Sequence, residues 1–136
     1  MTAKIVYQGD LRTIATHLVS QTILETDAPT DNQGKGERFS PTDLLATSLG
    51  CCMVTIMGIK AQEMMLDIKE TNIEITKVMA AEPRRVSAIK LIFTFPSSLH
   101  LNDKQKQILE HAARHCPVAK SIHPDIIIDL SFLWPS

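Results

Sequence analysis

Three cysteines are the residues of this chain best suited to covalent chemistry, and they lie in two places. Cys51 and Cys52 are adjacent inside an apolar segment, and Cys116 is followed directly by Pro117. A thiol attacks a peroxide or a disulfide as its thiolate, and helix N-termini and nearby cations favour the thiolate. If the fold brings the two places together, the protein contains a dithiol centre.

The local sequence favours Cys116 as the more easily ionised thiol. Because Pro117 suits the first position of a helix, Cys116 is expected to cap that helix with its sulfur facing unpaired backbone N–H groups. Arg114, His115 and Lys120 add positive charge close by in the sequence. These features are typical of a thiol with a lowered pKa.

Cys52 has a different setting, because it lies well inside an apolar helix. Burial alone would raise the pKa of its thiol, so Cys52 is expected to react only if the fold brings a cation or a hydrogen-bond donor to it. Otherwise it fills space in the core as a small hydrophobic residue. Neighbouring residues on a helix point about 100° apart, so only one of Cys51 and Cys52 can face a given site.

The elements that must position these thiols are predicted from the pattern of apolar residues. Residues 5–7, 12–18 and 22–26 form short runs, the longer ones alternating between apolar and polar, and predict an antiparallel meander. A long loop from 27 to 39 follows, and loops of that length are often functional.

A helix is predicted from Ser40 to about Met65. Ser40 is a suitable N-cap, Pro41 suits the first helical position, and the carboxylate of Asp43 can reach back to the start of the helix. Residues 44–59 are apolar on nearly every side, which indicates a buried central helix.

The second half of the chain is predicted to contain a long hairpin, two helices and a final strand. The hairpin pairs residues 67–79 with 86–95, the helices cover 102–115 and 116–122, and the last strand covers 125–133. Runs of strands with helices between them indicate the α+β class. The length of 136 residues indicates a single domain, residues 1–136.

Composition argues against several classes of protein. A formal net charge of −1 argues against nucleic-acid binding. The apolar stretch 44–59 is short for a membrane span and the N-terminus lacks a secretory apolar core, so we expect no membrane association and a cytoplasmic location. In that compartment, cysteines are expected to be free, catalytic or redox-sensing. His111 and His115 have the spacing of a metal pair, but no third ligand accompanies them, so we expect no metal and no cofactor.

The two cysteine segments resemble those of the OsmC/Ohr family, the osmotically inducible protein C and organic hydroperoxide resistance proteins. The first segment is Ser40-Pro41-Thr42-Asp43-Leu44-Leu45-Ala46 with Gly50-Cys51-Cys52-Met53, and the second is Cys116-Pro117-Val118-Ala119-Lys120-Ser121-Ile122. The resemblance covers nearly the whole chain, because the order of strands and helices also fits. It implies an α+β fold of antiparallel sheets around a long buried central helix, in an intertwined homodimer.

The resemblance also implies a thiol-dependent peroxidase that reduces organic hydroperoxides. Cys52 takes the position of the attacking thiol and Cys116 that of the resolving thiol, while Cys51 stands where the family does not normally have a cysteine. A sulfenic acid on Cys52 would condense with Cys116, and a dithiol reductant, either a lipoylated protein or a small dithiol, would restore the pair.

The residues that would activate Cys52 follow the family pattern less closely. The family's best-known peroxidases have a glutamate after the motif proline, which fixes an arginine beside the reactive thiolate, and this chain has Thr42 there. Asp43 is the candidate substitute, Arg38 and Arg12 are the candidate cations, and Glu37 could orient either one.

Two other functions remain open. The missing glutamate at position 42 favours a non-catalytic protein of the same fold, which binds a small apolar or thiol-bearing ligand at the dimer interface. The other alternative is a disulfide-exchange protein that uses the same cysteine pair on protein substrates.

Overall fold

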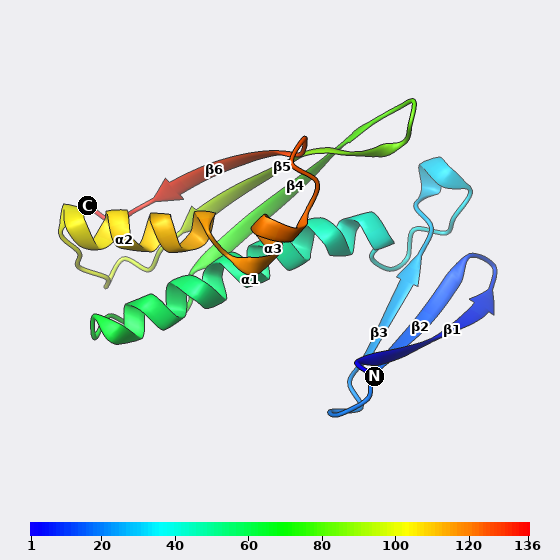
Figure 1. The fold of residues 1–136 in the computed structure, drawn as a ribbon, viewed down its shortest axis with the longest axis horizontal. Coiled ribbons are helices and arrows are strands. Elements are labelled where there is room, and N and C mark those ends of the chain that lie inside the picture. The colour runs from blue at the N-terminus through cyan, green and yellow to red at the C-terminus, as the bar shows by residue number, and fades with distance from the viewer. The chain divides into compact units, whose positions relative to one another are not determined.

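The computed structural model describes residues 1–136 and divides the chain into two compact units, Met1–Leu45 and Ala46–Ser136. We call them unit 1 and unit 2 and describe each by itself. Figure 1 labels their helices and strands. The expectation that residues 1–136 form a single domain stays a prediction.

Unit 1 is built on a three-stranded antiparallel sheet. Its strands β1 (Ala3–Gly9), β2 (Arg12–His17) and β3 (Ile23–Asp27) lie in that order, as the meander predicted. Asp10 and Leu11 connect β1 to β2 with positive φ angles of 52° and 62°, the conformation that a tight two-residue hairpin turn requires. The register pairs Arg12, the first residue of β2, with Asp27, the last residue of β3 before the next loop.

The loop after β3 is folded back on itself rather than extended. It contains a short 3₁₀ helix, η1 (Thr30–Asn32), and the Asp27 N–H donates to the Phe39 carbonyl over 3.1 Å, which joins its two ends. A Cβ atom at Gly34 would collide with the carbonyl of Ala28, so this close return of the chain requires glycine.

Helix α1 (Pro41–Glu63) begins in unit 1 and continues into unit 2. Its start is the predicted capping box. The Ser40 Oγ accepts from the Asp43 N–H, and the Asp43 carboxylate accepts from the Ser40 N–H, each over 3.0 Å.

Unit 2 contains a second three-stranded sheet with helices on one face (Figure 1). Strands β4 (Asn72–Ala80) and β5 (Arg85–Thr94) form the predicted hairpin, and β6 (Ile127–Leu133) lies on the other side of β5. Helices α2 (Asp103–Arg114) and α3 (Pro117–Ser121) connect β5 to β6.

The second sheet corrects the expectation of purely antiparallel sheets, because β6 runs parallel to β5. A connection through two helices is long enough to return the chain to the same end of the sheet, which a parallel pairing requires. The α+β class itself is confirmed.

The core of unit 2 lies between the sheet and its helices. The inward face of β5 supplies Ile89, Leu91 and Phe93, all fully buried, and α1 supplies Leu49, Met53 and Met57. A Cβ atom on Gly50 would lie 2.6 Å from Cδ1 of Ile75, so α1 packs closely against the sheet there.

Helix α1 is buried on one face only, although its sequence predicted burial on nearly every side. Leu49 and Met53 are fully buried, whereas Cys51 is exposed and Ile59 is half exposed. The helix is long and apolar enough to cross a membrane by length and composition alone, but core helices pass the same test. The predicted burial of α1 on nearly every side is therefore only partly observed, because some of its apolar side chains are exposed in the single chain.

Candidate functional site

The structure brings Cys52 and Cys116 together within unit 2. Cys52 lies on α1 and is half-buried, and Cys116 lies between α2 and α3 and is fully buried. The Cys52 side chain is close enough to Cys116 to raise the pKa of its thiol, and both thiols are free. Cys51 is exposed on another side of α1, as the helical spacing predicted.

Cys116 caps helix α3 with its sulfur. Its backbone is extended, its Sγ accepts from the Ala119 N–H over 3.4 Å, and Pro117 occupies the first position of the helix. This is the cap that the Cys116-Pro117 sequence predicted.

The cap does not lower the pKa of the Cys116 thiol, which corrects the local sequence interpretation. Burial raises the pKa of the Cys116 thiol, and this effect exceeds the lowering by the Ala119 N–H. The neighbouring Cys52 raises the pKa of Cys116 further. Cys116 is therefore held as a protonated thiol in the reduced protein, and its S–H is available to donate to the sulfur of Cys52.

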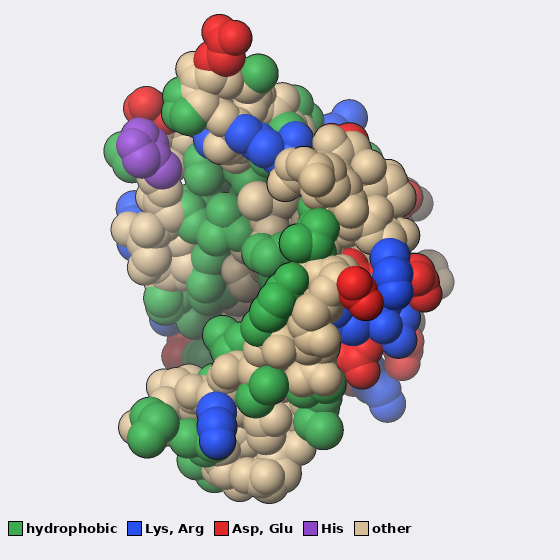
Figure 2. Space-filling model, turned by 90° about the vertical axis from the view of Figure 1, so that its right-hand side faces the viewer, with side chains coloured by type: hydrophobic (Ala, Val, Ile, Leu, Met, Phe, Trp, Pro, Cys, Tyr) green, Lys and Arg blue, Asp and Glu red, His purple; other side chains and the backbone are tan.

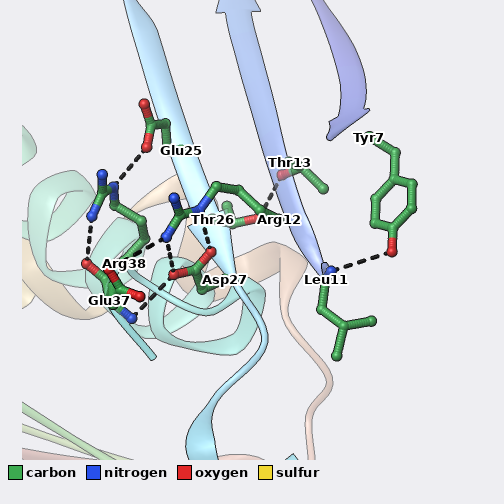
Figure 3. Close-up of polar contacts among 9 residues, drawn as sticks. All are labelled: Tyr7, Leu11, Arg12, Thr13, Glu25, Thr26, Asp27, Glu37 and Arg38. Carbon is green, nitrogen blue, oxygen red and sulfur yellow. Dashed lines mark hydrogen bonds and ion pairs between the residues drawn. The ribbon is translucent and has the colours of Figure 1, made fainter. Parts of the chain in front are cut away.

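A second cluster of functional candidates lies in unit 1, where charged side chains of β2, β3 and the following loop meet (Figure 3). Arg12 binds Asp27 with two hydrogen bonds, from Nε to Oδ1 over 2.7 Å and from Nη2 to Oδ2 over 2.8 Å. Asp27 also accepts from the Glu37 N–H over 3.1 Å. Asp27 is almost fully buried, and the Arg12 guanidinium holds the pKa of its carboxyl below the usual range.

The structure separates the two candidate arginines. Arg38 binds Glu25 through Nε over 2.6 Å and the Glu37 carbonyl through Nη1 over 3.0 Å. The Glu37 carboxylate lies 3.9 Å from Nη2 of Arg12, so its side chain accompanies Arg12 rather than Arg38. An open surface cavity of about 350 Å³ is lined by Arg12, Arg38, Glu25 and neighbouring residues.

Asp43 is held at the start of α1. One of its carboxylate oxygens accepts from the Ser40 N–H in the capping box. This contact gives Asp43 a structural role, and its proposed role as a substitute for the family glutamate stays a prediction.

Asp27 and Glu25 are parts of the charged cluster that sequence reasoning missed. Both lie on β3, and Asp27 faces Arg12 across the β2–β3 hairpin. An antiparallel register in which Thr16 pairs with Ile23 places Arg12 opposite Asp27, so the opposite charges at these two positions were the available signal. No group of three or more His, Cys, Asp and Glu side chains is arranged to hold a metal ion.

The whole chain, with its two thiols on α1 and at the start of α3, was compared with known protein families. The family model of OsmC-like proteins matches residues 34–131, a range that includes both cysteine segments. The chain belongs to the OsmC-like protein family. The resemblance seen in the cysteine segments is thereby confirmed.

Solved structures share the OsmC-like fold over nearly the whole chain. A protein from Psychrobacter arcticus 273-4, described as a "putative osmotic stress induced and detoxification response protein", is 58% identical, with 97% of this chain and 95% of that chain covered and a TM-score of 0.93. An organic hydroperoxide resistance protein OsmC from Legionella pneumophila is 18% identical over 97% and 95% of the two chains, with a TM-score of 0.74.

An OsmC-like protein from Mycoplasma pneumoniae is 15% identical over 97% and 96% of the two chains, with a TM-score of 0.72. These last two likenesses show the fold alone. No curated protein sequence matches the chain.

Proposed function

We propose that this OsmC-like protein is a thiol-dependent redox protein of the stress response that reduces organic hydroperoxides. The observation that supports it most is the pair of free, neighbouring thiols of Cys52 and Cys116, which interact closely enough to shift the pKa of Cys116. The named relatives agree with it, because a detoxification response protein and an organic hydroperoxide resistance protein share this fold.

The proposed reaction uses two thiols and one peroxide bond. The Cys52 thiolate attacks the terminal oxygen of the hydroperoxide, the O–O bond breaks, and the alcohol leaves with a proton while Cys52 becomes a sulfenic acid. The Cys116 thiol displaces water from that sulfenic acid and forms a disulfide. A dithiol then reduces the disulfide and becomes a disulfide itself, so two electrons pass from dithiol to peroxide.

The properties of Cys116 support its part as the resolving thiol. Because burial raises the pKa of Cys116, it stays protonated in the reduced protein and does not compete for the peroxide. Its S–H can donate to the Cys52 sulfur, and a hydrogen bond to the charged form of a group favours that form.

The test measures peroxide consumption with cumene hydroperoxide and dithiothreitol. Wild-type protein should turn over, Cys52→Ser should fall to the rate of buffer, and Cys51→Ser, the matched control one residue away, should stay close to wild type. In a separate reaction without dithiothreitol, Cys116→Ser should consume about one equivalent of peroxide and leave a trappable sulfenic acid. Equal rates for wild type and Cys52→Ser would refute the proposal.

The same assay assigns the proposed roles of the charged residues. If Arg12 supplies the activating cation, Arg12→Ala should lower the rate far more than Arg38→Ala, and Glu37→Gln should have a smaller effect. If Arg38 supplies it, the order of the two arginine variants reverses. Asp43→Asn keeps an acceptor for the helix cap and tests whether the charge of Asp43 contributes to the rate.

A second candidate function is non-catalytic binding of a small apolar or thiol-bearing ligand by the same fold. Thr42 in place of the family glutamate and the full burial of Cys116 favour it. Alkylation kinetics separate the two functions, because an activated Cys52 reacts with iodoacetamide at neutral pH much faster than an unperturbed thiol. Slow alkylation together with no peroxide turnover would favour ligand binding.

We also propose that the protein acts as a cytoplasmic homodimer. Large apolar side chains are exposed in the single chain, among them Ile5, Tyr7, Val19 and Ile59. Figure 2 shows hydrophobic side chains at the surface of one face of the molecule. Large exposed apolar surfaces are typical of protein interfaces. Sedimentation equilibrium should give twice the chain mass of 15.1 kDa.

A further inference from the structure

Two histidines of unit 2 are used neither by the thiol pair nor by the charged cluster of unit 1. His111 lies in the last turn of α2 and His115 is the C-cap residue of that helix, and both side chains are exposed. Their imidazole rings stack with centroids 4.0 Å apart and planes inclined by 25°. We call these two residues the histidine pair. Their spacing alone did not predict a metal site, but the structure adds direct contact between the two rings.

The ring of His115 is held by the backbone of α2. Its Nδ1 lies 2.8 Å from the His111 carbonyl oxygen, which can only accept, so this nitrogen carries a proton. In the neutral imidazole, the lone pair of Nε2 is then free for a metal ion. Histidines that bind metals almost always donate their other ring N–H in this way, because the contact fixes the tautomer and the ring orientation. The contact is therefore a second indication of a metal ligand, independent of the spacing.

The separation of the two rings suits a chelate. Zn–N bonds of about 2.0–2.1 Å place two neighbouring ligand nitrogens roughly 3 Å apart. Rings with centroids 4.0 Å apart reach that separation by small rotations, which the broad χ2 torsion of histidine permits. Two imidazoles fill two positions around the ion, and water fills the others, as at sites that keep open positions.

The charged side chains next to the histidine pair on α2 have contacts elsewhere. The Arg114 guanidinium lies over the Phe132 ring, 5.9 Å from its centroid. The Glu110 carboxylate accepts from Nε1 of Trp134 over 2.9 Å. The candidate ligands are therefore the two imidazoles, without a carboxylate.

We infer that the histidine pair binds a divalent ion of a late first-row transition metal, namely Ni²⁺, Cu²⁺ or Zn²⁺. Imidazole nitrogen suits these ions, whereas Mg²⁺, Ca²⁺ and Mn²⁺ prefer carboxylate, carbonyl and water oxygens. The inference does not rest on the proposed redox function, because that reaction uses neither histidine.

The test titrates the full-length, reduced protein with Zn²⁺ and follows the histidine ring nitrogens by NMR. Zn²⁺ is chosen because it has no redox chemistry that would oxidise the thiols. Nε2 of His115 should shift as it binds the metal, while Nδ1 keeps its proton. The ring of His111 should shift over the same range of Zn²⁺ concentration, and Mg²⁺ should shift neither ring. Binding should weaken in acid, because protons compete for the same nitrogens.

Two single variants test whether both rings hold the ion. His111→Gln and His115→Gln should each weaken Zn²⁺ binding at the remaining ring by about 10- to 100-fold, an effect that loss of a ligand's supporting partner alone can have. Each variant leaves one imidazole, which binds without the advantage of a chelate. Circular dichroism checks that each variant is folded.

His100→Gln is the matched control. It removes an exposed imidazole from the segment between β5 and α2, so the histidine pair should bind Zn²⁺ as in wild type. In the wild-type spectrum, the His100 ring also gives the Zn²⁺ concentration at which a histidine outside the pair responds. The thiols can bind Zn²⁺ as well, and the ring shifts distinguish that binding from binding at the pair.

Zn²⁺ binding at the histidine pair no tighter than at His100 overturns the inference. Binding that both glutamine variants leave unchanged also overturns it, because the pair is then not a chelate. Coordination through Nδ1 of His115 would contradict the inferred site, since that nitrogen donates to the His111 carbonyl. Each of these outcomes leaves the proposed peroxide reduction intact.

Discussion

Unit 1 and unit 2 are stabilised by different interactions. The buried residues of unit 1 are Thr26, Asp27 and Ser40, all polar, and the Arg12–Asp27 pair joins two of its strands. The buried side chains of unit 2 are almost all apolar and form one cluster between α1, β5 and α2. Unit 2 therefore depends on the removal of apolar surface from water, and unit 1 depends on directed polar bonds.

This difference has a consequence for where the apolar residues of unit 1 lie. Ile5, Tyr7 and Val19 are more than half exposed in the single chain. A three-stranded sheet needs a covered hydrophobic face for independent stability. The comparison teaches that the single chain forms a covered apolar core in unit 2 but leaves apolar side chains of the unit 1 sheet exposed. The proposed homodimer would cover them.

The largest expected effect tests the apolar core of unit 2. Phe93→Ala should lower the free energy of unfolding by about 3–5 kcal/mol, because it leaves a cavity beside fully buried neighbours. The matched change in unit 1 is Ile5→Ala, at a side chain that is 67% exposed. In dilute protein it should change the free energy by less than about 0.5 kcal/mol.

Urea denaturation at low and high protein concentration checks both values. If Ile5→Ala costs as much as Phe93→Ala in the monomer, the contrast between the units is wrong. If its cost appears only at high concentration, a second copy covers the sheet of unit 1.

An intermediate effect tests the polar interior of unit 1 through pH. The pKa of Asp27 is lowered in the folded protein, so its charge stabilises the fold above the unfolded-state value of about 4. This contribution is lost as pH falls through the lower folded-state pKa. Asp27→Asn should therefore be less stable than wild type at pH 7, and the difference should shrink in acid.

Thermal unfolding from pH 7 to pH 2 measures this difference, and hydrogen exchange of β2 and β3 should locate it in unit 1. Glu25→Gln is the control, because the Glu25–Arg38 pair is partly exposed and such pairs contribute only about 0–1 kcal/mol. A constant difference between Asp27→Asn and wild type across this pH range would contradict the assigned role of the charge.

The smallest expected effect measures how tightly α1 packs in unit 2. Gly50→Ala gains about 1 kcal/mol of helix propensity but places a Cβ atom 2.6 Å from Cδ1 of Ile75, so the two effects should nearly cancel. Adding Ile75→Val removes that Cδ1 atom, and Gly50→Ala should then become favourable.

Gly58→Ala is the control on the same helix, because nothing lies within 4 Å of a Cβ atom built there. It should stabilise the protein by about 1 kcal/mol. If Gly50→Ala stabilises as much as Gly58→Ala without any change at Ile75, the close approach of α1 to the sheet does not constrain position 50.

Local patterns were sufficient to predict most elements of the fold. The Ser40–Asp43 capping box, the alternation of Ile89, Leu91 and Phe93, and the Cys116-Pro117 cap each depend on neighbours in sequence, and each is observed. Strand β4 begins later than predicted, at Asn72, because the chain first turns with a positive φ of 71° at Glu70.

Features that depend on distant residues were harder to predict. The parallel pairing of β6 with β5 depends on where two helices return the chain, and alternation alone does not encode direction. The proximity of Cys52 and Cys116 came only from the family resemblance. Local signals also gave the wrong direction for the pKa of Cys116, because they report the helix cap but not the burial of the sulfur.

The cap of α3 gives the sulfur of Cys116 a structural role beside its proposed role as the resolving thiol. The Ala119 amide proton points at that sulfur. Its NMR chemical shift should therefore follow each change of the sulfur from thiol to disulfide, and so act as a reporter of the oxidation state from inside the protein. Serine at position 116 keeps an acceptor for that amide, whereas alanine leaves the first turn of α3 uncapped. A comparison of these two variants would separate the proposed role of the sulfur as a nucleophile from its role as the N-cap of the five-residue helix α3.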